Sequence, residues 1–138
     1  MFDAVMTCIN KKDIFISVAA VADWKVTNAH PNKCKKENNE APTILLAQNP
    51  DILASVSALS NKPFCVGFAA ESENLIAHGT KKRIKKNIPL LVGNIGPNTF
   101  GRDDNELILF DETGHTTLAP ATKNKLAQQL ISEIVKRM

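Results

Sequence analysis

Residues that could bind a ligand stand where the first apolar segment of the chain ends. The run Ile14–Ala20 is rich in β-branched and small residues and leads through Ala19 and Ala20 to Asp23. In open α/β sheets, ligands bind beyond the carboxyl ends of the strands. The small residues would let a ligand approach the backbone, and Asp23 could offer a carboxylate to a hydroxyl group or to a metal ion. The alternative is that the alanines pack and Asp23 belongs to a turn.

A second apolar segment ends in the same way. The run Phe64–Ala70 contains Gly67 and Phe68 and is followed by Glu71. A glycine inside a strand permits another group to approach the backbone closely. Phe68 could be a platform for a base and Glu71 a second carboxylate, or the two are a core side chain and a solvated one.

Two basic clusters could neutralise an anion. The first runs over 33–36 and contains Lys33, and the second runs over 81–86 and contains Lys82 and Lys86. Cations near the end of a helix complement its dipole, which is one explanation of the second cluster. Lys82 and Lys86 are also one helical turn apart and point the same way, a spacing that suits a polyphosphate. The lysines around 33 could close over phosphates or form a solvated stretch.

The segment around Pro50 is typical of a helix start. Asn49 could cap the helix, Pro50 suits its first position and Asp51 suits its positive end, with Ile52 and Leu53 following. Backbone N–H groups at such a start could also bind an anion or a carbonyl group.

The elements that must position these residues alternate along the chain. We expect helices over 2–9, 49–60, 72–86 and 122–135, strands over 14–20, 43–47, 64–70 and 90–93, and a hairpin over 106–118. Continuous apolar strands between helices are typical of a parallel sheet in an α/β fold. The sequence thus predicts one domain over 1–138 with three layers, a mainly parallel sheet and a C-terminal hairpin at one edge. Residues 22–42 are expected to form a long loop.

Composition narrows the function classes. With 43% hydrophobic and 22% charged residues, the chain is typical of a globular protein. Its aromatic content of 5% and net charge of +3 count against a nucleic-acid-binding module. No apolar run is long enough to cross a membrane, and the widely spaced Cys8, Cys34 and Cys65 predict no disulfide framework, so we expect a cytoplasmic location.

Six short motifs occur together in one order. They are Ala19-Ala20-Val21-Ala22-Asp23, Lys33-x-Lys35-Lys36, Asn49-Pro50-Asp51-Ile52-Leu53, Gly67-Phe68-Ala69-Ala70-Glu71, Lys82-x-x-x-Lys86-Asn87 and Phe100-Gly101-x-Asp103-Asp104-Asn105. This set resembles phosphopantothenate–cysteine ligase, also called phosphopantothenoylcysteine synthetase, whose fold is Rossmann-like. In most bacteria this enzyme is the C-terminal half of a bifunctional coenzyme A biosynthesis protein. Any FMN would belong to the decarboxylase half, which this chain does not contain.

The resemblance implies a CTP-dependent condensation of 4′-phosphopantothenate with cysteine, assisted by Mg²⁺ and performed by a homodimer. It implies that Lys33 acts on the phosphates during activation and that Lys82 and Lys86 hold the triphosphate. The other nucleotide contacts that it implies are Ala19, Ala20, Asp23, Pro50, Asp51, Ile52, Leu53 and Phe68. Asp23 is also the candidate metal ligand, and segment 22–42 is a candidate dimerisation arm or active-site flap.

The chain departs from the family pattern at several points. The family's Gly-rich opening and an Asn–Ser–Ser–Gly segment have no counterpart here, and Asn94-Ile95 stands where Asn-Asp is usual. We therefore expect a truncated ligase domain that is incomplete by itself. The alternative function is a non-catalytic basic module that binds nucleotides or nucleic acid, or that dimerises.

Overall fold

The strands of the computed structural model form one five-stranded sheet and one two-stranded sheet. The structure describes residues 1–29, 32, 43–95 and 101–138. The chain divides into two compact units, residues 1–18 with 52–138 (the sheet unit) and residues 19–51 (the β2–β3 unit). Each is described here by itself.

The five-stranded sheet is mixed rather than mainly parallel. Its strand order is β1-β4-β5-β6-β7. The strands are β1 (Ile14–Ser17), β4 (Phe64–Glu71), β5 (Leu90–Ile95), β6 (Asp104–Asp111) and β7 (Gly114–Thr122). The first three are parallel to one another, whereas β6 is antiparallel to β5 and β7 antiparallel to β6. The predicted hairpin at the edge is confirmed, and two of the four strand pairings in this sheet, β5–β6 and β6–β7, are antiparallel.

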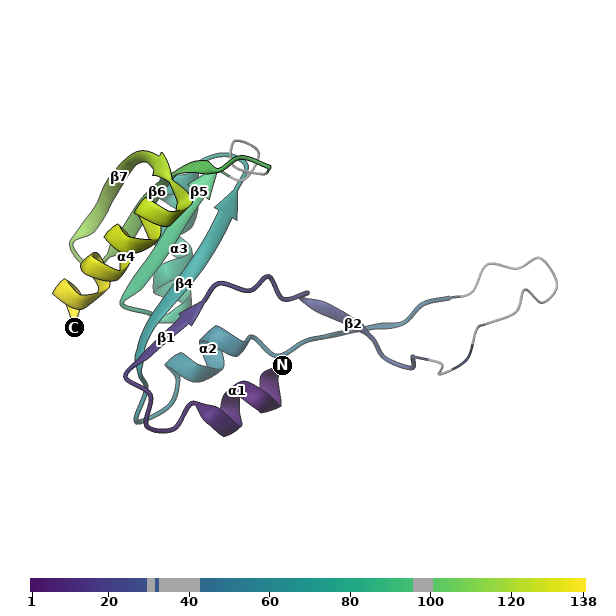
Figure 1. Ribbon diagram of the computed structural model, residues 1–138. Helices are drawn as coiled ribbons and strands as arrows, with labels where there is room; N and C mark the ends of the chain where they lie inside the picture. The colour runs from purple at the N-terminus through teal and green to yellow at the C-terminus, as the bar shows by residue number, and fades with distance from the viewer. Residues whose placement is uncertain (30–31, 33–42, 96–100) are drawn as a thin grey trace. The chain divides into compact units, whose positions relative to one another are not determined.

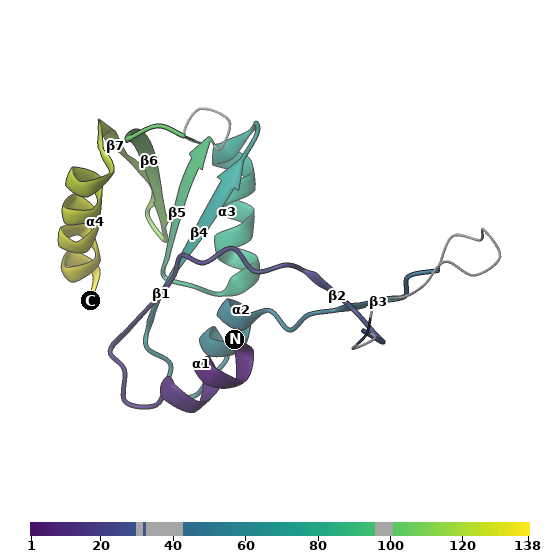
Figure 2. The ribbon, with the colours of Figure 1, turned by 45° about the vertical axis from the view of Figure 1, so that its right-hand side comes forward.

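Helices cover both faces of this sheet, as predicted. Helices α1 (Phe2–Cys8), α2 (Ile52–Ser57) and α3 (Leu75–Lys86) pack on one face, and α4 (Lys123–Arg137) packs on the other. Figures 1 and 2 show the sheet between α3 and α4. The first face buries Ile9, Leu53, Val56, Cys65, Ala69, Leu75, Ile88, Leu91 and Phe110. The second face buries Val66, Leu90, Val92, Leu107, Leu109, Leu126, Leu130 and Ile134.

Helix α4 buries a narrower stripe than the sequence predicts. The apolar spacing in the sequence predicts that Ile131 and Val135 face inward with Leu126, Leu130 and Ile134, but Ile131 is 50% and Val135 63% exposed. Leu126, Leu130 and Ile134 recur about once per turn, and they are the buried residues of α4 because the helix packs on the sheet with one side only.

Strand β1 differs from the expected strand over 14–20. It is shorter, lies at one edge of the sheet, and is only half-buried. Strand β4, which has partners on both sides, shows the deep burial predicted for both segments. The apolar pattern of residues 14–20 therefore identified the strand but not its position in the sheet.

The β2–β3 unit contains a short antiparallel pair. Strand β2 (Trp24–Val26) pairs with β3 (Leu46–Gln48), so Trp24 lies opposite Gln48. This corrects the expectation of a loop from residue 22 onward, because β2 occupies the first part of that segment. The rest of the predicted loop lies largely outside the described residues, as does Lys33.

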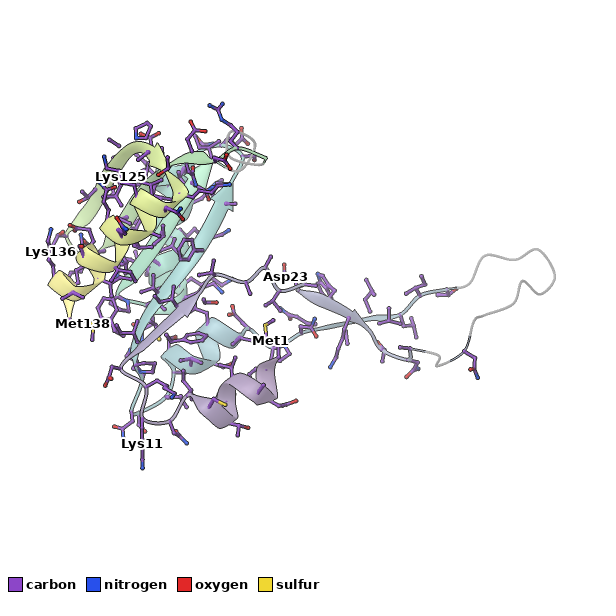
Figure 3. The ribbon with its side chains drawn as sticks, viewed as in Figure 1. Met1, Lys11, Asp23, Lys125, Lys136 and Met138 are labelled. Carbon is purple, nitrogen blue, oxygen red and sulfur yellow. The ribbon has the colours of Figure 1, made fainter. Side chains whose placement is uncertain are left out.

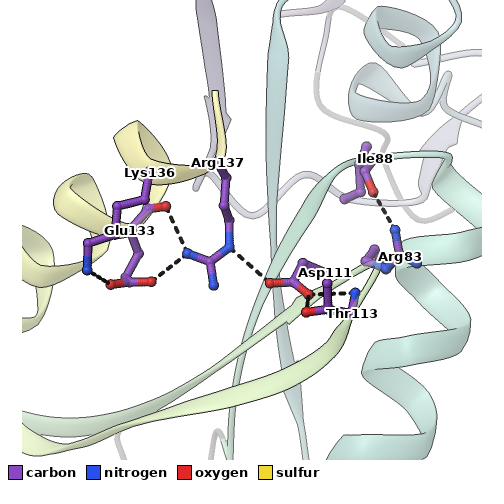
Figure 4. A network of polar contacts seen from close by, with 7 residues as sticks. All are labelled: Arg83, Ile88, Asp111, Thr113, Glu133, Lys136 and Arg137. Carbon is purple, nitrogen blue, oxygen red and sulfur yellow. Dashed lines mark hydrogen bonds and ion pairs between the residues drawn. The ribbon is translucent and has the colours of Figure 1, made fainter.

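A network of charged groups fastens the end of α4 to the turn between β6 and β7 (Figure 4). Arg137 donates from Nε to Asp111 Oδ2 at 3.0 Å and from Nη1 to Glu133 Oε2 at 2.5 Å. Lys136 Nζ lies 2.6 Å from Glu133 Oε1. Burial alone raises the pKa of Asp111, but hydrogen bonds from Thr113 and Arg137 outweigh it and lower that pKa below its ordinary value.

Candidate functional site

The candidate site starts at the carboxyl end of β4, where Glu71 is the last residue of the strand. Its side chain is 14% exposed. Two side chains of α3 face it: Lys82 Nζ lies 2.5 Å from Glu71 Oε1, and His78 Nδ1 lies 3.5 Å from Glu71 Oε2. We call these three residues the β4–α3 cluster. The cluster lies at the carboxyl end of a parallel strand, the end of the sheet at which α/β proteins bind ligands.

The turn from β4 into α3 explains how the cluster forms. Asn74 precedes the helix in the left-handed backbone region, with φ at 51°, a conformation that asparagine adopts more readily than most residues. The turn reverses the chain, so α3 runs back along the sheet. His78 and Lys82 are four residues apart and therefore lie on one side of the helix.

Lys86 also belongs to α3, but at the end remote from Glu71. Its backbone carbonyl accepts a hydrogen bond of 2.6 Å from Ser57 Oγ at the end of α2. The spacing of one turn between Lys82 and Lys86 is confirmed, and along a helix one turn amounts to about 5.4 Å. A ligand held by both ammonium groups must therefore extend along α3, as a polyphosphate chain would.

Phe68 lies on the face of the sheet that α4 covers, opposite to the face that α3 covers. It is half-buried and packs against the core beneath α4, whereas Lys82 belongs to a helix that packs on the opposite face. The structure thus does not bring the Phe68 ring beside the Lys82 ammonium. A ligand that contacts both must reach around the ends of the strands.

Ile52 and Leu53 begin α2 and are core residues. They are 8% and 6% exposed, and Leu53 packs with the cluster under α1 and α3. Because both side chains are buried, a nucleotide could contact only the backbone of these two residues. Pro50 and Asp51 precede them and belong to the β2–β3 unit, where both are exposed.

Within the β2–β3 unit, Ala19, Ala20 and Asp23 are exposed. Figure 3 labels Asp23 immediately before β2. Asn49 fastens this segment, because its backbone N–H donates to Asp23 O at 2.7 Å and its side-chain Nδ2 donates to Ala22 O at 2.9 Å. The prediction that Asn49 caps a helix starting at Pro50 is wrong, because α2 begins at Ile52, and the side chain of Asn49 joins the two strands of this unit instead.

The described residues provide no cage of protein ligands for a cation. Among residues 1–29, 32, 43–95 and 101–138, no three His, Cys, Asp or Glu side chains gather as metal ligands would. Mg²⁺ usually keeps several waters and binds through substrate phosphates with one or two carboxylates. The metal assignment to Asp23 therefore stays a prediction.

Cys65 is a core residue rather than a nucleophile. Its side chain is fully buried, and burial raises the pKa of its thiol although Lys62 partly opposes this. A buried thiol with a raised pKa is a poor nucleophile because the thiolate is the reactive form.

Sequence reasoning missed one member of the β4–α3 cluster. None of the candidate residues named from the sequence is His78, and the sequence leaves Glu71 open between a functional and a solvated carboxylate. The available signal was an acidic residue directly after a buried strand, followed by a helix with His and Lys four residues apart. Nothing local in the sequence shows that the helix turns both side chains toward Glu71.

The helices in the described parts of the chain are all too short or too polar to span a lipid bilayer.

The fold and the cluster define the chain as an α/β domain whose mixed sheet lies between helices and presents charged side chains at a strand end. All residues 1–138 match the family described as the DNA/pantothenate metabolism flavoprotein C-terminal domain, and the chain belongs to this family. The resemblance indicated by the six motifs is confirmed.

Individual relatives agree with this assignment. The chain is 39% identical over 140 residues to the coenzyme A biosynthesis bifunctional protein CoaBC of Haemophilus influenzae, covering 99% of this chain and 35% of that protein. The crystal structure of the C-terminal domain of a CoaBC protein matches with a TM-score of 0.75 at 27% identity, covering 96% of this chain and 58% of that one. A Cab2 mutant in complex with phosphopantothenate-cysteine shares the fold, with a TM-score of 0.53 at 15% identity over 69% of this chain and 33% of that one. The chain thus spans about a third of the length of the curated relative it matches.

Proposed function

We propose that this chain forms the nucleotide-binding part of a phosphopantothenate–cysteine ligase in coenzyme A biosynthesis. The observation that supports this most is the family match over the whole chain, together with an ammonium group held at the carboxyl end of a central strand.

The proposed reaction has two steps. A carboxylate oxygen of 4′-phosphopantothenate attacks the α-phosphorus of CTP, the bond to the bridging oxygen breaks, and pyrophosphate leaves. The amine of cysteine then attacks the acyl carbon of the cytidylate and loses a proton. CMP departs with its oxygen, and the amide remains.

Lysines would assist the first step because negative charge moves onto the departing pyrophosphate. Fixed cations stabilise such developing charge more strongly than water does. We assign Lys82 and Lys86 to the triphosphate and Lys33 to the phosphates at the reacting end. Bound Mg²⁺ would supply further positive charge on the phosphates. The nucleoside would be contacted by Ala19, Ala20, Asp23, Phe68 and the segment 50–53.

A homodimer is part of the proposal, as is a cytoplasmic location. The β2–β3 unit exposes large apolar side chains, with Trp24 58%, Val26 45% and Leu46 57% exposed. Neighbouring exposed apolar side chains are typical of interaction surfaces. Replacing Trp24 and Leu46 by serine should convert a dimer to a monomer in sedimentation experiments, and an unchanged dimer would exclude this surface.

The experiment that tests the function replaces the matching segment of the Haemophilus influenzae protein by residues 1–138 of this chain. We expect the chimera to release pyrophosphate from CTP only when 4′-phosphopantothenate is present, and to form the amide when cysteine is added. Lys82→Ala in the chimera should abolish most of this release, and Lys81→Ala should not. A folded chimera that retains the decarboxylase activity of its other half but releases no pyrophosphate would contradict the proposal. Salt-sensitive binding to random oligonucleotides without CTP competition would favour the nucleic-acid alternative instead.

A further inference from the structure

The β4–α3 cluster contains a second side chain suited to a phosphate group. We propose that His78 binds phosphate oxygens together with Lys82, and that Glu71 is the residue that positions both. This inference rests on the proposed function for the identity of the natural ligand, but its geometry concerns the cluster alone. None of the six motifs includes His78.

Glu71 has a physical reason to hold the two side chains. Its Oε1 atom is shielded from water, and the Lys82 ammonium 2.5 Å away supplies the opposite charge. A buried carboxylate without a compensating group is costly, so the ion pair is maintained. A free lysine side chain loses conformational freedom when it is fixed, which opposes binding. Because Glu71 already restrains Lys82, this side chain loses less conformational entropy when a ligand binds.

The outward sides of both residues stay open to a ligand. The side chains of His78 and Lys82 are each 48% exposed. An ammonium group has three N–H donors, so contact with Glu71 leaves others available. With Nδ1 of His78 directed at Glu71, Nε2 is the nitrogen that remains, and it donates when the imidazole is protonated.

The separation of the two side chains fits neighbouring oxygens of a polyphosphate. Residues four apart on a helix have Cβ atoms about 5–6 Å from each other.

A purely electrostatic role for Glu71 makes the opposite prediction to a positioning role. If Glu71 only subtracts charge, Glu71→Gln should make a phosphate ligand bind more tightly. If Glu71 positions Lys82 and His78, the same change should weaken binding even though it removes a negative charge. The sign of the effect therefore separates the two roles.

The test measures binding of inorganic tripolyphosphate to the 138-residue chain by calorimetry. We expect His78→Gln to weaken binding roughly 3- to 10-fold, the range for one lost hydrogen bond, and Lys82→Ala to weaken it by about 10-fold or more. His78→Arg should restore the affinity because it supplies a permanent cation. Glu71→Gln should weaken binding by a few-fold. Lys81→Ala is the matched control, since Lys81 lines a separate groove on α3 with Ile84 and Lys85.

Each outcome decides the inference. Equal losses for Lys81→Ala and Lys82→Ala, no effect of His78→Gln, or tighter binding by Glu71→Gln would overturn it, and circular dichroism of each variant excludes unfolding as the cause. Loss through His78 and Lys82 with no competition by CTP would support the inference while contradicting the proposed function. CTP-dependent pyrophosphate release by the chimera with unchanged kinetics in His78→Gln would overturn the inference and leave the proposed function in place.

Discussion

The contact between α3 and the sheet depends on Gly79, which faces the ring of Phe110 on β6. Gly79 is buried in the middle of α3, and Phe110 is fully buried beneath it. A Cβ atom at position 79 would stand 2.6 Å from Cε2 and Cζ of that ring. The ring cannot move aside freely, because a Cβ at Gly93 on β5 would also lie 2.9 Å from its Cε2 atom. We therefore expect Gly79→Ala to destabilise the fold.

Two opposing effects set the magnitude. Alanine is favoured over glycine in a helix interior by about 1 kcal/mol. Overpacking of a well-packed core costs about 1–3 kcal/mol. The contact of 2.6 Å involves two atoms of a fully buried ring, which places the cost in the upper part of that range. The free energy of unfolding should fall by about 1–2 kcal/mol, which lowers the melting temperature by about 3–8 °C in a domain of this size.

Urea unfolding followed by circular dichroism measures this change. Thr80→Ala is the control, because Thr80 is exposed on the same helix and should tolerate alanine with a small gain in stability. In a Phe110→Leu background the ring is absent, and Gly79→Ala should become neutral or stabilising. If Gly79→Ala stabilises the unaltered protein as Thr80→Ala does, the proposed close approach of α3 to the sheet is wrong.

Three further predictions concern the polar contacts of the fold. Arg137→Ala should lower the unfolding free energy by about 1–2 kcal/mol in denaturant titration, because it leaves the half-buried Asp111 without its cation. Lys136→Ala is the control and should change the unfolding free energy by less than about 0.5 kcal/mol, because the Lys136 side chain is exposed. Because the pKa of Asp111 is lowered in the folded protein, its ionised form stabilises the fold above about pH 4, and this contribution is lost as the pH falls through the folded-state pKa. Asp111→Asn should therefore reduce the loss of unfolding free energy at acidic pH. An unchanged loss at acidic pH would contradict the role given to the Asp111 carboxylate. Ser57→Ala should cost about 1 kcal/mol, measured by thermal unfolding, because the carbonyl of Lys86 loses its hydroxyl donor, and Ser57→Thr should recover part of it.

Sequence patterns predicted the sheet unit well wherever local chemistry determines the element. The apolar run ending at Glu71 is β4, and the polar turn Asp111–Gly114 joins β6 to β7. These elements have strong signals, namely continuous burial and a turn with glycine. Thr122 also caps α4, its hydroxyl accepting from Lys125 N, where the sequence places the helix start.

Local patterns are insufficient where a distant partner decides the outcome. Strand β2 consists of exposed residues, and only pairing with β3, about twenty positions later, makes it a strand. Phe68 follows the alternation of β4, yet which face it occupies depends on where the flanking helices pack. His78 is exposed, as a surface residue would be, but its contact with Glu71 has no local signal because Glu71 belongs to a preceding element. Such relations depend on tertiary packing rather than on local propensity.

The two edges of the five-stranded sheet differ greatly in the length of chain that each must close. Phe110 and His115 pair across a short turn, whereas Ile14 pairs with Phe64, fifty positions along the chain. Closing a long segment costs more entropy, and non-local pairing slows folding. We expect the β6–β7 ribbon and α4 to assemble first and β1 to join last. In hydrogen–deuterium exchange, the amides of β1 should accordingly lose their protection before those of β5 and β6.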